Sequence, residues 1–129
     1  MKNSVQDGKV LTFTESLLVH PSHSDGFVDA GDPVIVGRIV GVAYENAAAA
    51  TDSVNVQTEG VFDLSVSSIH NGISVGETVY IDPSTAALSD DLNDVPYGVA
   101  LETVAGGGTD TINVKLFGAT PGTAGGANS

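Results

Sequence analysis

Gly31-Asp32-Pro33-Val34 begins a pattern of three blocks that starts again at Gly76-Glu77-Thr78-Val79. The other two blocks follow in the same order in each copy: Gly41-Val42-Ala43-Tyr44-Glu45 is matched by Gly98-Val99-Ala100-Leu101-Glu102, and Thr51-Asp52-Ser53-Val54-Asn55-Val56 by Thr109-Asp110-Thr111-Ile112-Asn113-Val114. The spacing is also kept, with 13 residues from Gly41 to Val54 and 14 from Gly98 to Ile112. The chain is therefore internally duplicated, and each copy predicts a β-meander that buries its apolar face against the other.

The composition predicts one small all-β domain. The chain has 129 residues, 41% of them hydrophobic, and these are mostly Val, Ala, Leu and Ile rather than aromatic residues. Sixteen Gly and 5 Pro are spread along the chain at intervals typical of short strands in a barrel or a sandwich. The absence of Cys excludes disulfides and thiolate chemistry. We expect a small barrel or sandwich built from two similar β-meanders.

The ends of the chain differ from its middle. Residues 1–8 lack the apolar stretch of a secretory signal and are expected to form a flexible N-terminal arm. Residues 9–118 are expected to form the single β-domain. Residues 119–129 contain Gly, Ala, Thr and Pro without periodicity, which predicts a disordered tail.

Apolar residues at alternating positions predict the strands and the core. Val54 and Val56 alternate with polar residues, as do Phe62, Leu64 and Val66, which indicates strands with one solvated face. Asn71-Gly72 predicts a type I′ turn, and residues 84–94 predict an exposed loop inserted in the second copy. The expected core residues are Val34, Val40, Val54, Val56, Phe62, Leu64, Val79, Val99, Ile112, Val114 and Leu116.

The charge excludes several classes of partner. Four Lys and Arg against 16 Asp and Glu give a formal net charge of -12. Such a chain is repelled by the phosphates of nucleic acids and by anionic lipids, so neither nucleic acid nor membrane is expected as a partner.

The polar clusters have an ordinary structural interpretation beside a functional one. His20, His23 and Asp25 are either metal ligands or part of a solvated loop, and the loop is favoured because zinc needs three or four ligands in defined geometry. Residues 90–94 are acidic but lack EF-hand spacing, which favours a solvated loop over a calcium site.

Catalytic and phosphate-binding motifs are also missing. Ser67, Ser68 and His70 occur without a nucleophile elbow, and residues 106–108 lack the Lys of a phosphate loop and instead predict a tight hairpin connection. We expect no catalytic site, no cofactor and no bound metal.

Several segments resemble one family of tailed-phage proteins. They are the N-terminal arm with Gly8, the turn at Gly31, Gly37-Arg38-Ile39-Val40-Gly41-Val42-Ala43, Thr58-Glu59-Gly60-Val61-Phe62-Asp63-Leu64, Gly76-Glu77-Thr78-Val79-Tyr80, Gly98-Val99-Ala100 and Ile112-Asn113-Val114-Lys115-Leu116. Across residues 1 to 118 the chain is similar to capsid decoration, or cement, proteins, a family that has also been catalogued under a phage recombinase label. Residues 17–29 and the Gly-rich tail depart from the family pattern.

The resemblance implies a structural virion protein rather than an enzyme. It would be made in the host cytoplasm, bind the major capsid protein on the outer surface of the capsid, often as a homotrimer, and stabilise the shell. The residues expected to contact the capsid or a neighbouring subunit are Lys2, Asn3, Ser4, Val5, Gln6 and Glu59. For Glu59 the alternative is a turn residue that binds backbone amides.

Two other functions are weighed against this one. A recombination protein needs a phosphate loop and a basic path for DNA, and both are missing. We therefore expect neither ATP hydrolysis nor DNA binding. A small β-sandwich module that binds a ligand such as carbohydrate needs exposed aromatic platforms, for which only Tyr44, Tyr80 and Tyr97 are available.

Overall fold

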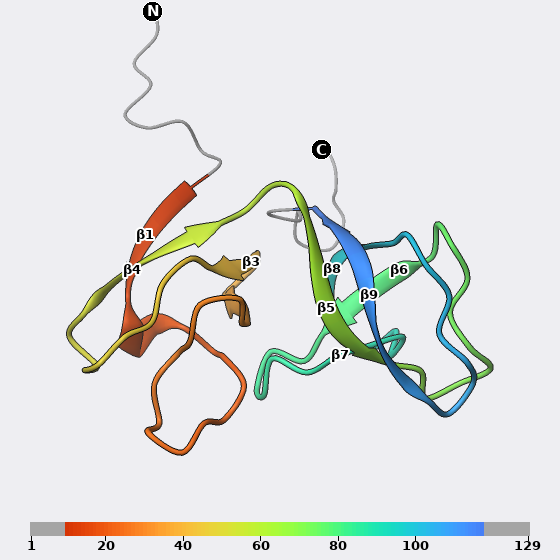
Figure 1. Ribbon diagram of the computed structural model, residues 1–129, viewed down its shortest axis with the longest axis horizontal. Helices are drawn as coiled ribbons and strands as arrows, with labels where there is room; N and C mark the ends of the chain where they lie inside the picture. The colour runs from red at the N-terminus through yellow and green to blue at the C-terminus, as the bar shows by residue number, and fades with distance from the viewer. Residues whose placement is uncertain (1–9, 118–129) are drawn as a thin grey trace, which may run out of the picture.

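The computed structural model describes residues 10–117, and its regular structure is β-strand apart from one 3-10 turn (Figure 1). The predicted N-terminal arm (residues 1–8) and the predicted C-terminal tail (residues 119–129) lie outside the described residues. No α-helix occurs between residues 10 and 117. The elements are β1 (Val10–Thr14), the 3-10 turn η1 (Glu15–Leu17), β2 (Pro33–Val36), β3 (Ile39–Ala43), β4 (Ser53–Gln57), β5 (Val61–Ser67), β6 (Thr78–Ile81), β7 (Leu88–Ser89), β8 (Val95–Ala100) and β9 (Thr109–Leu116).

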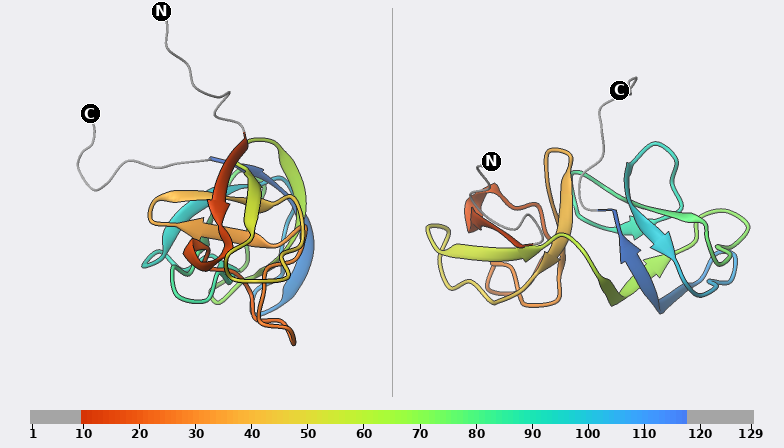
Figure 2. Two further views of the ribbon diagram at one scale, coloured as in Figure 1. Left: turned by 90° about the vertical axis from the view of Figure 1, so that its left-hand side faces the viewer. Right: turned by 90° about the horizontal axis from the view of Figure 1, so that it is seen from above.

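These strands form two halves that lie side by side. The first half is a four-stranded antiparallel sheet in the order β1-β4-β3-β2, and the second is a closed barrel in the order β5-β7-β6-β8-β9. Figure 2, in its view from above, shows β4 and β5 following one another as the chain passes from one half to the other. The all-β prediction of two similar β-meanders is confirmed, one copy forming a curled sheet and the other a small barrel.

Backbone hydrogen bonds confirm the duplication in detail. The Gly31 amide donates to the Ala43 carbonyl at 2.8 Å, and the Gly76 amide donates to the Ala100 carbonyl at 2.8 Å. Each of these glycines has a φ of +92°, a conformation that favours glycine. The Glu45 carboxylate accepts the Asn55 amide at 2.9 Å, as the Glu102 carboxylate accepts the Asn113 amide at 2.7 Å.

The duplication extends further than the sequence blocks indicate. β1 pairs with β4 so that Phe13 faces Val54, and β5 pairs with β9 so that Leu64 faces Ile112, which is the counterpart of Val54. β1 is therefore the counterpart of β5. The sequences of β1 and β5 have little similarity, which explains why the three repeated sequence blocks did not include them.

The outer edges of β2 and β6, which are counterparts, pair with different segments of the chain. In the barrel, β7 pairs with β6 through Tyr80 and Ser89. In the first half, Val19 pairs with Ile35, the counterpart of Tyr80, through two backbone hydrogen bonds of 3.0 and 3.1 Å. The expectation that residues 84–94 form only an exposed loop is wrong, because Ala86 and Leu88 are buried and β7 belongs to the barrel.

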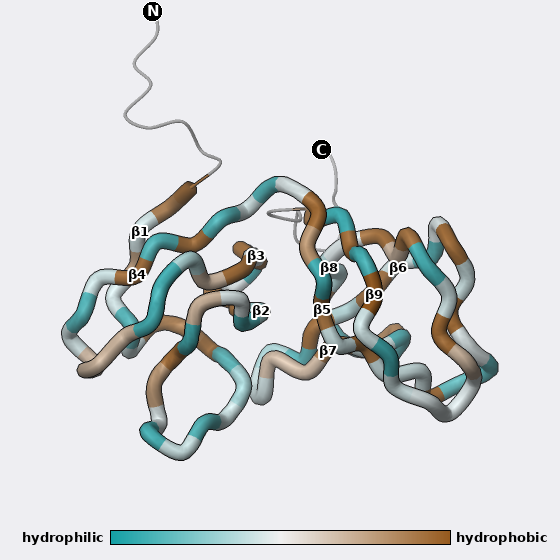
Figure 3. Tube along the Cα trace, viewed as in Figure 1, coloured by the Kyte–Doolittle hydropathy of each residue, from teal (hydrophilic) through white to brown (hydrophobic). Residues whose placement is uncertain are grey.

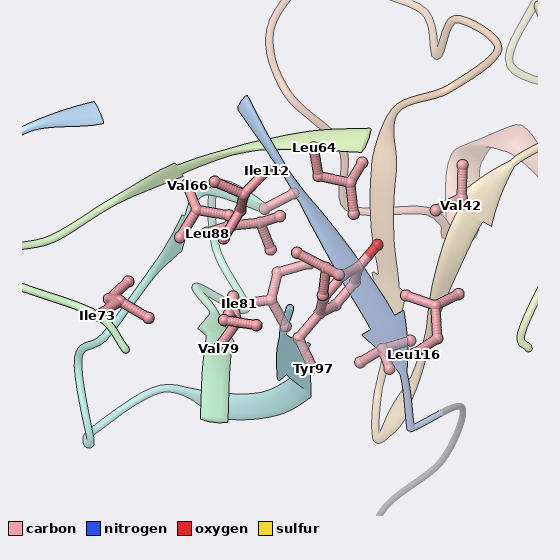
Figure 4. Close-up of a cluster of buried hydrophobic side chains, with 14 of the residues drawn as sticks. Val42, Leu64, Val66, Ile73, Val79, Ile81, Leu88, Tyr97, Ile112 and Leu116 are labelled. Carbon is pink, nitrogen blue, oxygen red and sulfur yellow. The ribbon is translucent and has the colours of Figure 1, made fainter. Parts of the chain in front are cut away.

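The larger core cluster joins the two halves. It contains barrel residues together with Ile35 from β2 and Val40 and Val42 from β3, and Figure 4 shows Val42 and Leu116 in the same cluster. The buried Tyr97 hydroxyl donates to the Gly41 carbonyl of β3 at 2.8 Å. A smaller cluster around Val54 and Val56 fills the first half.

Nine of the expected core residues are buried and two are not. Figure 3 shows how hydrophobic and hydrophilic residues alternate along β5, the pattern on which these predictions rested. Val99 is only half-buried, because strand alternation places it on the face of β8 opposite to Gly98 and Ala100, which are buried. Tyr97 is buried at the point where the register of β8 against β6 shifts. Phe62 is half-buried and packs against the larger cluster from its edge. Tyr97 is wholly buried, so it is not available as an aromatic platform.

One of the turn predictions is wrong and another is confirmed in part. Gly72 has a φ of +107°, but Asn71 does not have the positive φ that a type I′ turn requires. The turn packs against the β8–β9 connection, where Gly72 lies so close to the Val104 carbonyl that a Cβ would meet its oxygen at 3.0 Å. Residues 105–108 do form a tight turn, closed by a 2.9 Å hydrogen bond from the Gly108 amide to the Ala105 carbonyl. The connection between β8 and β9 is longer than this turn, because it begins at Leu101 and includes Val104, which pairs with Ile73.

Candidate interaction surface

Glu59 lies at the bend that joins the two halves. It is exposed between β4 and β5, next to Gly60, whose φ is +121° and whose carbonyl accepts the Leu116 amide at 3.0 Å. Its carboxylate accepts none of the hydrogen bonds found among residues 10–117, so the alternative that it binds backbone amides of its turn finds no support there. The other five predicted contact residues, Lys2, Asn3, Ser4, Val5 and Gln6, lie outside the described residues.

The outer edge of β1 is the second candidate surface. β1 is the edge strand of the first sheet, and among the described residues it pairs with β4 alone. Val10, Thr12 and Thr14 are exposed. Unpaired amides and carbonyls along such an edge can bind another extended chain. The predicted arm enters this strand directly.

A hollow of about 480 Å³ lies at the far end of the barrel. Its lining includes Glu77, Tyr80 and Asp90, together with Leu92, whose side chain is 74% exposed. Partial burial raises the pKa of Asp90, but hydrogen bonds from the Ile69 amide and the Ser68 hydroxyl outweigh it and leave that pKa below its ordinary value. A second hollow, of about 400 Å³, lies between the halves and is lined by Pro21, Pro33 and Asp63 among others.

His20, His23 and Asp25 lie in a loop as expected, and Asp25 is exposed, but both histidines are bonded to carboxylates and His20 is largely buried. The His20 side chain is 12% exposed and bonds at 2.8 Å to Glu15, whose own side chain is 6% exposed. His23 bonds at 2.6 Å to Asp32. Sequence reasoning missed Glu15 because a glutamate that begins a polar turn has no pattern that predicts burial.

A family model described as phage cement protein matches residues 5–116, which is most of the chain. The chain belongs to the phage cement protein family. Searches of curated proteins and of solved structures give no significant match. The resemblance identified from the sequence is confirmed for the cement family, whereas nothing supports the recombinase label.

Membership of a cement protein family makes this a structural component of a phage virion that associates with the capsid. The polar clusters of this cement protein are used to hold loops together. The Ser68 hydroxyl, which is buried, donates to Asp90 at 3.1 Å and accepts the Gly72 amide at 2.9 Å, so it is not placed as a nucleophile.

The acidic residues 90–94 of the cement protein also hold a loop together by hydrogen bonds. The Asp91 carboxylate accepts the Asn93 amide at 2.9 Å. Burial raises the pKa of Asp94, with smaller contributions from the charges of Asp91 and Asp82.

Within residues 10–117 no group of three or more His, Asp or Glu side chains could hold a metal ion. No helix in this part of the chain is long and apolar enough to cross a membrane.

Proposed function

We propose that this protein decorates the outer surface of a phage capsid, where it binds the major capsid protein and stabilises the shell. The observation that supports this most strongly is the match to the cement family over residues 5–116. It acts by adding contact area across the seams between shell subunits. A preformed β-domain loses little conformational entropy on docking, and an interface of about 1,600 Å² is enough for stable association.

We further propose that the working unit is a homotrimer. Three linked copies multiply weak single contacts, because the second and third contacts form within one complex. The shell is assembled where the phage is made, in the host cytoplasm, and the protein becomes part of the outer virion surface.

The N-terminal arm and Glu59 are the proposed contact residues. An arm that leads into the exposed edge strand β1 is well placed to add a strand to a neighbouring sheet, since backbone groups supply this affinity with little demand on side chains. Glu59 presents an exposed carboxylate at the bend between the halves. Charge repulsion is screened beyond about 8 Å at physiological ionic strength, so the docking contact should survive moderate salt.

The test is deletion of Met1 to Gln6, followed by binding to purified phage shells lacking their decoration protein. We expect occupancy by cryo-electron microscopy to fall while the circular dichroism and the melting temperature stay as in the full chain. Deletion of residues 119–129 is the matched control and should leave occupancy unchanged. Full occupancy after deletion of the arm would refute its role, and failure of the full chain to bind either expanded or unexpanded shells would refute the proposed function itself.

A further inference from the structure

Comparison of the two halves identifies a buried carboxylate in the first half that has no counterpart in the second. The pairing of β1 with β4 and of β5 with β9 places Glu15 at the position of Val66, a wholly buried core residue of the barrel. Glu15 is also buried. Burial of a carboxylate is unfavourable unless it is paired and hydrogen-bonded. The first half must therefore contain partners for Glu15 that the barrel does not need.

His20 is the first of these partners. Its Nε2 lies 2.8 Å from Glu15 Oε2, which also accepts the Val28 amide at 3.2 Å, and its Nδ1 lies 2.7 Å from the Pro21 carbonyl oxygen. A carbonyl can only accept, so Nδ1 must have a proton. A second proton must lie between Nε2 and Glu15, because otherwise two lone pairs face each other at a buried contact.

His23 extends the cluster toward β2. Its Nε2 lies 2.6 Å from Asp32 Oδ2 and its Nδ1 lies 3.5 Å from Asp29 Oδ2, so both nitrogens face carboxylates. The hydrogen bond to Asp32 is the largest cause of a raised His23 pKa, with smaller contributions from the charges of Asp32, Asp29 and Asp25. The His20 and His23 rings are stacked, with centroids 6.3 Å apart.

The corresponding turn of the barrel works without histidine. There Glu77 accepts the Ser74 amide at 2.6 Å, as Asp32 accepts the Asp29 amide at 2.9 Å in the first half. The connection from Ser16 to Val28 contains eleven residues, including both histidines, whereas the corresponding connection from Ser67 to Ile73 contains five. The histidines therefore hold the longer connection and are not needed to form the turn itself.

We propose that Glu15, His20, His23 and Asp32 form a proton-dependent latch that fixes the segment from Leu18 to Asp32 and releases it as the pH rises. The segment includes Val19, which pairs with Ile35 at the outer edge of β2, and the buried core residues Leu18 and Val28. Release of the latch uncovers the outer edge of β2 and one side of the smaller core. This device is independent of the capsid-binding role.

The direction of the pH dependence follows from the groups that face the two rings. These are Glu15 from η1, Asp25 and Asp29 from the connection, Asp32 before β2, and the other histidine. A histidine whose pKa is raised on folding contributes stability that is complete below its ordinary pKa of about 6.5 and is lost as the pH rises through the raised value.

The chain contains a matched internal control for the test. Val19 and Ile35 exchange two backbone hydrogen bonds, and so do Ile73 and Val104 in the barrel, at 2.9 Å each and with no histidine in the pair. Amide hydrogen exchange, corrected for intrinsic rates, should be measured by NMR on the full chain. Between about pH 6 and pH 8.5, we expect protection at Val19 and Ile35 to fall about tenfold or more relative to Ile73 and Val104.

Variants then assign the effect to the latch. The double variant His20→Asn, His23→Asn should remove the pH dependence of the Val19–Ile35 pair, and Glu15→Val, which introduces the barrel residue, should do the same with the fold retained. His70→Asn, at an exposed histidine of the barrel, should change nothing. The proposal would be overturned if both amide pairs of the wild-type chain showed the same pH dependence. It would also be overturned if the loss of protection at Val19 and Ile35 persisted in the double variant.

Discussion

Gly41 and Gly98 show how closely one residue of each copy approaches the neighbouring strand. A Cβ at Gly41 would lie 2.5 Å from the Gln57 carbonyl oxygen and 2.6 Å from Val56 Cγ1. A Cβ at Gly98 would meet the equivalent groups, the Lys115 carbonyl oxygen and a methyl group of Val114. The atoms that would be met include the backbone of β4 and of β9, which cannot rotate away. Equivalent strand pairs in the two halves thus require glycine for the same reason.

This predicts that Gly41→Ala and Gly98→Ala each lower the free energy of unfolding by about 1–3 kcal/mol, the usual effect of overpacking a core. Urea denaturation followed by circular dichroism would measure the change. Ser65→Ala, at an exposed position of β5, is the control and should stay within about 0.5 kcal/mol of the wild type. If either glycine variant unfolded with the same free energy as the wild type, the neighbouring strand could move away without a loss of stability, and the predicted requirement for glycine would be wrong.

At the scale of the elements, Asp90 fixes the segment between β7 and β8 to the end of β5. Its carboxylate accepts the Ile69 amide at 2.8 Å and the Ser68 hydroxyl at 3.1 Å. These bonds hold the end of β5 near Ser67, where it pairs with Ser89 of β7. Since that pairing completes the barrel, Asp90 supports closure of the second half.

Asp90→Asn should therefore destabilise the protein by about 1–2 kcal/mol at neutral pH through weakened hydrogen bonds. Because the pKa of Asp90 is lowered on folding, its contribution is present above the ordinary value of 3.8 and is lost as the pH falls through the lowered value. Thermal melts from neutral to acid pH should show the two proteins converging below about pH 4. A constant difference down to about pH 2 would contradict the role of the ionised carboxylate.

At the scale of the whole molecule, one core belongs to both halves. Ile35, Val40 and Val42 of the first half pack with the barrel residues, and the Tyr97 hydroxyl bonds to the Gly41 carbonyl across the boundary. Because neither half buries these side chains alone, we infer that residues 9–118 form a single cooperative domain. Burial raises the pKa of Tyr97 far above its ordinary range, so the hydroxyl stays protonated and able to donate throughout the neutral pH range.

We expect one unfolding transition in calorimetry, with equal calorimetric and van't Hoff enthalpies. Tyr97→Phe should lower the free energy of unfolding by about 1–3 kcal/mol and move the whole transition to lower temperature, because it leaves the buried Gly41 carbonyl without this partner. Tyr44→Phe, at a side chain 65% exposed, is the control and should shift it little. Two separate transitions in the wild type, only one of them sensitive to Tyr97→Phe, would contradict a single domain.

The fold class, the duplication and most of the core could be predicted from the order of the residues alone. These depend on local properties: strand alternation, the repeated Gly-Val-Ala blocks and the spacing of turn residues, each of which is visible along the chain. The cement protein family was also recognisable from sequence, because its motifs are spread over nearly the whole chain.

The segments that pair with the outer edges of β2 and β6, and the places of the polar groups, became known only from the folded chain. Val19 and Ser89 occupy corresponding places although they come from unrelated segments, since a sheet edge needs a partner backbone and not a particular residue. Glu15 is buried because His20 and the Val28 amide reach it, and those partners are five and thirteen residues away. Contacts of this kind depend on where the chain folds back, which the local pattern of residues does not specify.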